Sequence, residues 1–159
     1  DFARWLMDQG IGSLSLNRRV PGEFPPEALL EAVPMLQDFD IIVCQRQQKH
    51  YTLYRHSISS AYRWLTKILF GTDLFDPGST KIMKREIIET VHVTSKSVYV
   101  EAERVIRAVK RGYRLGRVGI HHETRKGGKA RGARLRTVLL AAYDVLRLWV
   151  SLTLLRKKP

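Results

Sequence analysis

The amino-acid sequence predicts an α/β protein, because segments with helical periodicity alternate with short apolar runs that are typical of strands. The run DIIVCQR (40–46) contains four consecutive apolar residues, which suits a strand buried on both faces, as in parallel sheets. Segments 53–70 and 97–111 repeat apolar residues at helical spacing, and a glycine, Gly71 or Gly112, follows each of them. Since the chain shows no internal repeat and no linker, we expect one layered α/β fold.

The remaining elements follow from the same signals. We expect the end of a helix over 2–9, closed by Gly10, a strand over 11–16, a helix over 26–37, a short segment around Met83 and Ile87, a strand within 113–124, and a final apolar helix from 135. Pro34 should kink or shorten the helix over 26–37. The buried stripes are expected to be Leu29, Val33 and Leu36; then Leu53, Ile58, Ala61, Tyr62, Leu65 and Leu69; then Val98, Ala102, Val105, Ile106 and Val109.

The chain is strongly basic. Its 28 Lys and Arg residues against 15 Asp and Glu give a net charge of +13. Such an excess indicates an anionic partner, which could be nucleic acid, a phosphorylated substrate or an anionic membrane face. The sharpest basic segment is RKGGKARG (125–132), whose glycines let backbone amides approach an anion, although a solvated mobile loop fits it equally well. It lacks the spacing of a P-loop.

Several local clusters have an ordinary structural explanation. Glu101 and Glu103 are two residues apart and therefore point to different faces of a helix, where early glutamates complement the helix dipole. His121 and His122 lie next to Glu123, but adjacent residues of a strand face opposite ways and do not chelate together. Cys44 is the single cysteine, which excludes an internal disulfide, and its apolar surroundings favour a buried thiol.

The final helix has two interpretations of equal weight: a packed core helix, or a helix lying at a membrane interface. Tyr143, Trp149 and the basic end at Arg156, Lys157 and Lys158 favour the second. The chain has no run of 18 uncharged apolar residues, so we expect no segment that spans a bilayer by itself. It begins with Asp1 and shows no leader, so we expect it to begin inside a longer protein.

Taken in order, these segments resemble the C-terminal part of family 2 glycosyltransferases, nearest to the dolichyl-phosphate mannosyltransferase-like, polyprenyl-phosphate sugar transferases. The resemblance runs through GEFPPEALLEAVPMLQDFDIIVCQR (22–46), the helix with Arg55 and Ser59, DPGSTKIMKRE (76–86) and VEAERVIRAVKRGYRLGRVGIHHETRKGGKARG (100–132). It implies a partial GT-A fold: a Rossmann-like sandwich with a parallel or mixed sheet and flanking helices. The portion would cover 1–136, followed over 137–159 by an amphipathic helix, for which the membrane interface is one of the two interpretations given above.

The resemblance also implies a reaction and its residues. A hexose would pass from a UDP- or GDP-linked nucleotide-sugar to a polyprenyl phosphate, dolichyl or undecaprenyl, at the cytoplasmic face of a membrane with an anionic surface. Arg46 corresponds to the arginine that closes a strand near the donor, and Asp76 to the aspartate of the acceptor loop, where an acid or base usually stands. The residues that would hold the lipid phosphate are Arg55, Ser59, Arg125 and Lys129.

The turn NRRVPGEFPPE (17–27) departs from the family pattern. The family's two metal-binding aspartates, which hold Mg²⁺ or Mn²⁺ against the donor diphosphate, fall on Arg19 and Pro21, so that Glu23 is the one carboxylate left nearby. Arg18 or Arg19 could neutralise a diphosphate directly. Three functions therefore remain open: a glycosyltransferase, a degenerate relative that binds lipid phosphate or a subunit, and a nucleic-acid-binding protein. The absence of an aromatic platform argues against the third.

Overall fold

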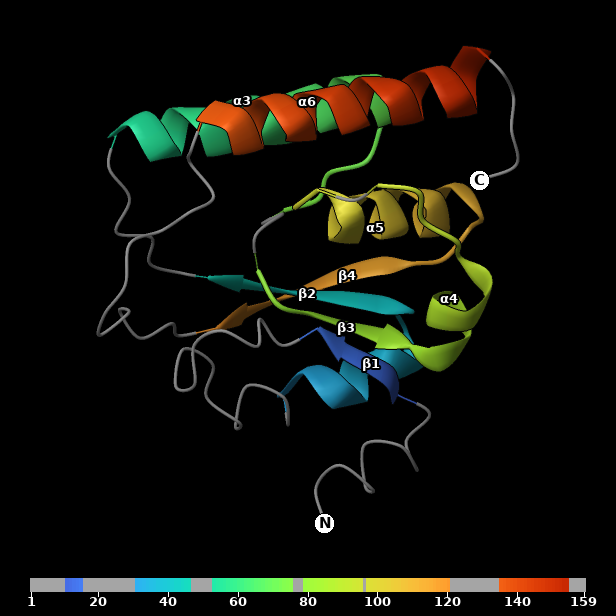
Figure 1. Cartoon of the computed structure of the whole chain (residues 1–159). Helices are drawn as coiled ribbons and strands as arrows, with labels where there is room; N and C mark the ends of the chain where they lie inside the picture. The colour runs from blue at the N-terminus through green and yellow to red at the C-terminus, as the bar shows by residue number, and fades with distance from the viewer. Residues whose placement is uncertain are drawn as a thin grey trace.

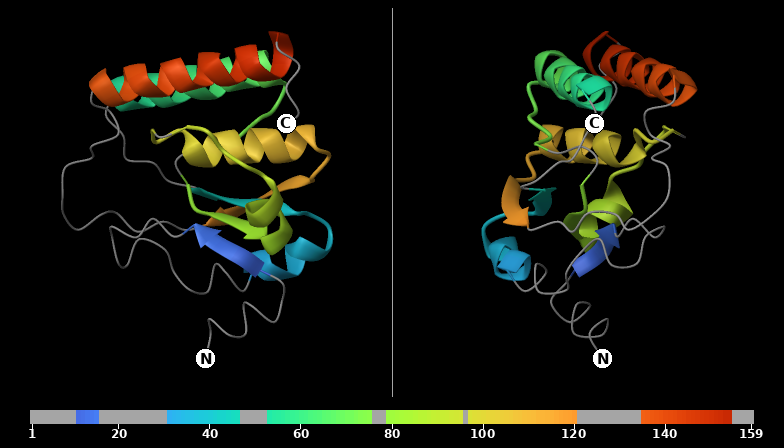
Figure 2. Two further views of the ribbon diagram at one scale, coloured as in Figure 1. Left: turned by 45° about the vertical axis from the view of Figure 1, so that its right-hand side comes forward. Right: turned by 90° about the vertical axis from the view of Figure 1, so that its left-hand side faces the viewer.

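The computed structural model describes residues 11–15, 31–46, 53–75, 79–95, 97–120 and 135–154. These residues form an α/β protein with a mixed sheet, which confirms the predicted fold class. The sheet lies in the middle of the layers. Helix α5 (Val100–Lys110) covers one face of it, and α3 (Leu53–Phe70) and α6 (Leu135–Trp149) lie side by side above α5 (Figure 1). Figure 2 shows the same stacking from two further directions.

The sheet has four described strands in the order β1-β3-β2-β4. They are β1 (Ile11–Ser15), β2 (Ile41–Arg46), β3 (Lys81–Lys84) and β4 (Leu115–Ile120). Strand β2 pairs in parallel with β4 and antiparallel with β3, and β3 pairs antiparallel with β1. The strands predicted at 11–16, 40–46 and 113–124 are therefore present, whereas β3 was not expected as a strand because it has only four residues and a lysine at each end.

Two apolar cores lie on the two faces of this sheet. The core on the α5 side combines sheet residues such as Ile41 and Met83 with Val105 and Ile106 of α5, and with Val145 of α6. The other face is covered by the short 3-10 helix η1 (Val33–Gln37), whose Val33 and Leu36 pack against Ile42 and Cys44 of β2. Both faces of β2 are covered, and its first four residues are fully buried. This burial explains why the strand is a continuous apolar run.

Two helix ends lie where glycine predicted them. Helix α3 ends before Gly71, whose φ is 68°, and the turn after α5 contains Gly112, whose φ is 95°. Both values lie in the left-handed region that glycine adopts without strain. The start of α5 was predicted wrongly: it begins at Val100, and Val98 lies outside it with 66% of its surface exposed.

Three further expectations need correction. A helix was expected over 26–37, but from Val33 to Gln37 the structure has a 3-10 helix, in keeping with Pro34. Leu29, expected on the buried stripe of that helix, lies outside the described residues. In α3 the predicted stripe is only partly buried, because Leu53 and Ala61 are exposed. The apolar helix α6 gives way at Val150 to a π-helical turn, η2 (Val150–Leu154).

Candidate functional site

The carboxyl ends of β2 and β4 lie at one edge of the sheet, because these strands run in parallel. In α/β sheets this edge is where ligands usually bind. Helices α3 and α6 both begin above it (Figure 1). The last paired residues are Arg46 of β2 and Ile120 of β4, so the two strands end beside each other. We refer to this place as the carboxyl edge.

Two cations face the α5 side of the sheet near the carboxyl edge. Val43 of β2 pairs with Lys81 on one neighbouring strand and with Arg117 on the other. Residues paired in register point to the same face, and alternate residues of one strand do so too. Since Ile41 belongs to the α5-side core, Val43 and the two cations point to that side as well. We call Lys81 and Arg117 the cationic row.

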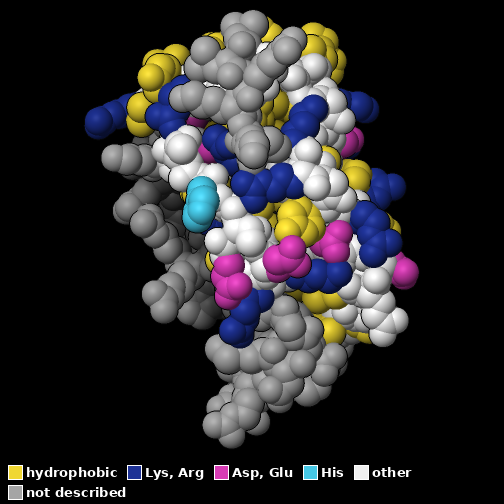
Figure 3. Space-filling model, turned by 90° about the vertical axis from the view of Figure 1, so that its right-hand side faces the viewer, with side chains coloured by type: hydrophobic (Ala, Val, Ile, Leu, Met, Phe, Trp, Pro, Cys, Tyr) yellow, Lys and Arg dark blue, Asp and Glu magenta, His cyan; other side chains and the backbone are white. Residues whose placement is uncertain are grey.

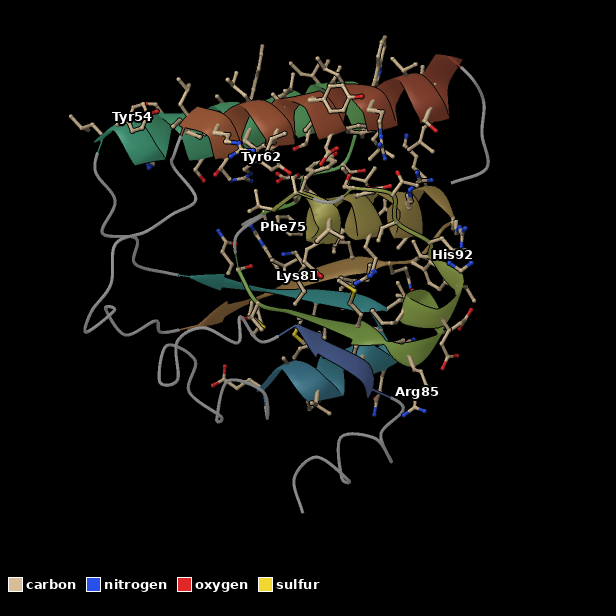
Figure 4. All side chains as sticks on the ribbon, viewed as in Figure 1. Tyr54, Tyr62, Phe75, Lys81, Arg85 and His92 are labelled. Carbon is tan, nitrogen blue, oxygen red and sulfur yellow. The ribbon has the colours of Figure 1, made fainter. Side chains whose placement is uncertain are left out.

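The two members of the cationic row differ in burial. Lys81 is 2% exposed, and its ammonium Nζ donates a hydrogen bond to the carbonyl of Ser79 at 3.0 Å. Arg117 is exposed, and its guanidinium carbon lies 5.3 Å from the centroid of the Phe75 ring, within cation–π range. Figure 4 shows Lys81 at the start of β3 and Phe75 above it. The edge therefore carries one buried and one accessible positive charge.

The loop that leads from α3 toward this edge is held by a bidentate ion pair. Arg63 donates from Nε and a terminal nitrogen to the two carboxylate oxygens of Asp73, at 2.8 and 2.7 Å. Asp73 Oδ1 also accepts a hydrogen bond from the amide of Phe75, whose φ of 53° is strained for a side chain of that size. The hydrogen bonds from Arg63 hold the pKa of Asp73 below its ordinary value, against an opposing effect of partial burial.

The structure describes only some of the residues expected at the site. Ser59 lies on α3, one turn after Arg55, and is half-buried; Arg46 ends β2, as expected. Other expected site residues lie outside the described residues: Arg19, Glu23, Asp76, Arg125 and Lys129. The pair His121 and His122 lies outside them too. The sequence analysis missed the cationic row, because the pairing of Lys81 and Arg117 with Val43 is set by strand register and not by local sequence.

The expected divalent cation does not fit the donor set. Within the part of the chain that the structure describes, no three His, Cys, Asp or Glu side chains are grouped so that they could hold a metal ion. Near the carboxyl edge the side chains of the cationic row would repel one. The turn 17–27 offers two carboxylates, Glu23 and Glu27, but neither stands at the two expected ligand positions, which Arg19 and Pro21 occupy, whereas Mg²⁺ is usually held through carboxylates and phosphates with several waters. We therefore derive no step through a metal.

Cys44 also lies near this edge, and it is not suited to nucleophilic chemistry. Its side chain is fully buried in the η1-side core, as expected. Burial raises the pKa of its thiol to about 11, because a thiolate would lose its hydration, and the positive charge of Lys81 offsets only part of this effect. At neutral pH the thiol stays protonated and inert.

The described molecule is thus an α/β protein whose carboxyl edge carries positive charge. No protein-family model matches the chain, and a search of curated proteins finds no match. The resemblance to family 2 glycosyltransferases rests on the residue pattern.

Proposed function

We propose that this chain is the C-terminal portion of a GT-A glycosyltransferase of family 2, which transfers a hexose from a UDP- or GDP-sugar to a polyprenyl phosphate at the cytoplasmic surface of a membrane. The observation that carries the proposal is the pair of cations on the α5 side of the sheet: the cationic row lies beside Val43 of β2, three residues before the end of that strand. Both substrates carry phosphate groups, which such positive charges suit.

The proposed reaction needs little from the protein besides position and charge. An oxygen of the acceptor phosphate forms a bond to the anomeric carbon of the sugar, the bond from that carbon to the donor diphosphate breaks, and the configuration is inverted. A phosphate ester carries its own negative charge near neutral pH, so no strong base is required. The work left to the chain is to hold two phosphorylated groups close together and to offset the charge that develops on the leaving diphosphate.

The test is transfer of radiolabelled hexose from UDP- or GDP-sugars to undecaprenyl or dolichyl phosphate by the full-length protein. Transfer should fall about 100-fold in Arg117→Gln, the scale expected when one preorganised charge-stabilising group is lost. Arg55→Ala and Arg125→Ala should abolish it, since they remove the expected phosphate ligands. Arg85→Gln is the matched control, because Arg85 is exposed and follows β3 at its far end (Figure 4).

Two results of these assays would count against the proposal. Equal loss in Arg117→Gln and Arg85→Gln would show that the carboxyl edge has no special role. Lack of transfer from every donor, with or without Mg²⁺ or Mn²⁺, would overturn the enzymatic proposal.

A second candidate is a relative that binds polyprenyl phosphate or a subunit without catalysing transfer. The specific observation in its favour is the replacement of both expected metal ligands by Arg19 and Pro21. This candidate predicts that polyprenyl phosphate binds to the full-length protein and that Arg55→Ala weakens the binding, while no donor sugar is consumed. Binding measured beside the transfer assay distinguishes the two candidates.

A further inference from the structure

The outward sides of α3 and α6 carry many large apolar side chains although they face solvent, interspersed on α3 with exposed polar residues such as Ser57 and Ser60. The exposed large side chains on these two helices and the turn after them are Leu53, Tyr54, Trp64, Ile68, Leu135, Leu139, Leu140, Tyr143, Leu146 and Val150. We call this set the outer face. Trp64 is 67% exposed and Tyr143 is 62% exposed. Figure 3 shows hydrophobic side chains on either side of the top of the molecule, where the helix pair lies.

The outer face is not needed for the packing of these helices. Their other sides supply the core: Phe70 of α3, together with Val145 and Leu148 of α6, is buried in the α5-side cluster. Tyr62 of α3 meets the Tyr99 ring edge-on, with 5.9 Å between the centroids. Each helix therefore carries large apolar side chains on two sides, and exposed apolar side chains gathered on one surface often mark an interaction site.

The charges beside the outer face have one sign. Helix α3 contains no Asp or Glu, and the only carboxylate of α6, Asp144, is 7% exposed and points into the protein. The exposed ionisable side chains on the two helices include Lys67, Arg136 and Arg147. A partner that covers this surface thus meets hydrophobic side chains, three of them aromatic (Tyr54, Trp64 and Tyr143), with positive charges beside them.

We propose that the outer face docks on a lipid bilayer that contains anionic headgroups, with α3 and α6 lying in the interface. Trp and Tyr favour the boundary between headgroups and acyl chains, and basic side chains beside them attract anionic lipid. A second copy of this chain fits poorly, because two positive rims would face each other. No described helix is long and apolar enough to cross a membrane.

This geometry relates the membrane to the carboxyl edge. Helices α3 and α6 run side by side and begin on the side of the molecule where β2 and β4 end (Figures 1 and 2). A bilayer in contact with the outer face therefore lies on the same side of the molecule as the first turns of α3 and α6, which are close to the carboxyl edge. The inference rests on the proposed function for the identity of the lipid-linked acceptor, but its evidence is the composition and exposure of the outer face.

The test is flotation of the full-length protein with vesicles of phosphatidylcholine containing 30% phosphatidylglycerol, with no sugar donor present. The protein should float with these vesicles and float less with pure phosphatidylcholine. Trp64→Gln combined with Leu139→Gln should weaken the partition at least about tenfold, since it removes buried apolar area. Arg136→Gln should weaken it about fivefold, and only with anionic vesicles.

Val98→Gln is the matched control, because Val98 is as exposed as Trp64 but lies on neither helix. Thermal unfolding should be nearly unchanged in all variants, since the outer face contributes nothing to the core. Absence of flotation by the unmodified protein, or equal loss in Val98→Gln, would overturn the proposal, as would a dimer in lipid-free buffer that Trp64→Gln dissociates. Flotation without sugar transfer would leave the docking intact and refute only the enzymatic proposal.

Discussion

Glu103 is a buried carboxylate that ties α5 to the extended segment before it. Its Oε1 accepts hydrogen bonds from the amide and hydroxyl of Thr94, at 3.0 and 3.1 Å, and from Nε of Arg107 at 2.8 Å. Its Oε2 accepts a hydrogen bond from the amide of Ser95 at 2.8 Å. Burial alone would raise the pKa of Glu103, but these donors outweigh it and hold the pKa below the ordinary value. An expected helix-dipole glutamate is thus an internal anchor.

We expect Glu103→Gln to lower the free energy of unfolding by about 3–5 kcal/mol, because it leaves Arg107 as an uncompensated buried charge and turns an acceptor into a donor that faces other donors. Urea unfolding followed by circular dichroism measures the loss. Glu101→Gln is the matched control on the same helix: Glu101 pairs with Arg104 at 3.4 Å, both side chains are only half-buried, and no backbone amide depends on Glu101 among the described hydrogen bonds, so its loss should cost about 1 kcal/mol. Similar losses in both variants would contradict the assignment of Glu103 as an anchor.

At the scale of elements, β4 comes close to the loop before β2 because it contains a glycine. A Cβ at Gly116 would lie 2.6 Å from Cγ and 2.8 Å from Cδ2 of the Phe39 ring. Gly112, at the other end of the turn before β4, has open space around it and a φ of 95°. Position 116 requires glycine because a side chain there would collide with the Phe39 ring, whereas position 112 requires it because of its backbone conformation.

We therefore expect Gly116→Ala to destabilise the protein by about 1–3 kcal/mol through overpacking. Gly112→Ala should cost about 1 kcal/mol through strain alone. Adding Phe39→Leu should recover part of the loss in Gly116→Ala, since it removes the ring that clashes, and none of the loss in Gly112→Ala. A double-mutant cycle of unfolding free energies measures this coupling. No coupling between positions 39 and 116 would argue against the contact.

The sequence could predict elements whose signals are local. The apolar run of β2, the periodicity of α3 and the glycines that follow α3 and α5 are all readable within a few residues. By contrast, β3 was missed because four residues with a lysine at each end carry no alternation. The cationic row could not be read at all, since it depends on the register of two strands against β2, which pairing and not local sequence decides. The exposure of Leu53 was missed because periodicity cannot tell an apolar face that meets the core from one that meets a partner.

At the scale of the whole molecule, three carboxylates fix the segments at the ends of strands and helices. Asp40, just before β2, accepts hydrogen bonds from Nζ of Lys84 at 2.6 Å and from the amide of Arg114 at 2.7 Å, so it connects three strands at the edge opposite the site. Partial burial would raise its pKa, but these donors lower it below the ordinary value of 3.8. Asp73 connects α3 to the loop that follows it, and Glu103 connects α5 to the segment that precedes it. The pKa of each of these carboxyl groups is also lowered.

These shifts predict loss of stability in acid. A group whose folded-state pKa is lower than its unfolded-state pKa stabilises the fold above the unfolded value, and the contribution disappears as the pH falls through the folded value. The ordinary pKa values are 3.8 for aspartate and 4.5 for glutamate, so the free energy of unfolding should begin to fall below about pH 4.5. Protonation also adds to a net charge that is already +13, and the resulting repulsion acts in the same direction.

The specific contribution of Asp40 can be separated from general repulsion by comparing the chain with Asp40→Asn in urea unfolding from pH 7 to pH 2. The unmodified chain should be more stable at pH 7, because an amide cannot accept from Lys84 and Arg114 as an anion does, and this advantage should shrink steadily below pH 3.8 as the carboxylate takes up a proton. Lys84→Met is the control: with one donor removed, the advantage of aspartate over asparagine at position 40 should be smaller at pH 7. An advantage that stays constant down to pH 2 would mean that the charge of Asp40 contributes nothing to the fold, and that the acid sensitivity of the molecule arises from its net charge alone.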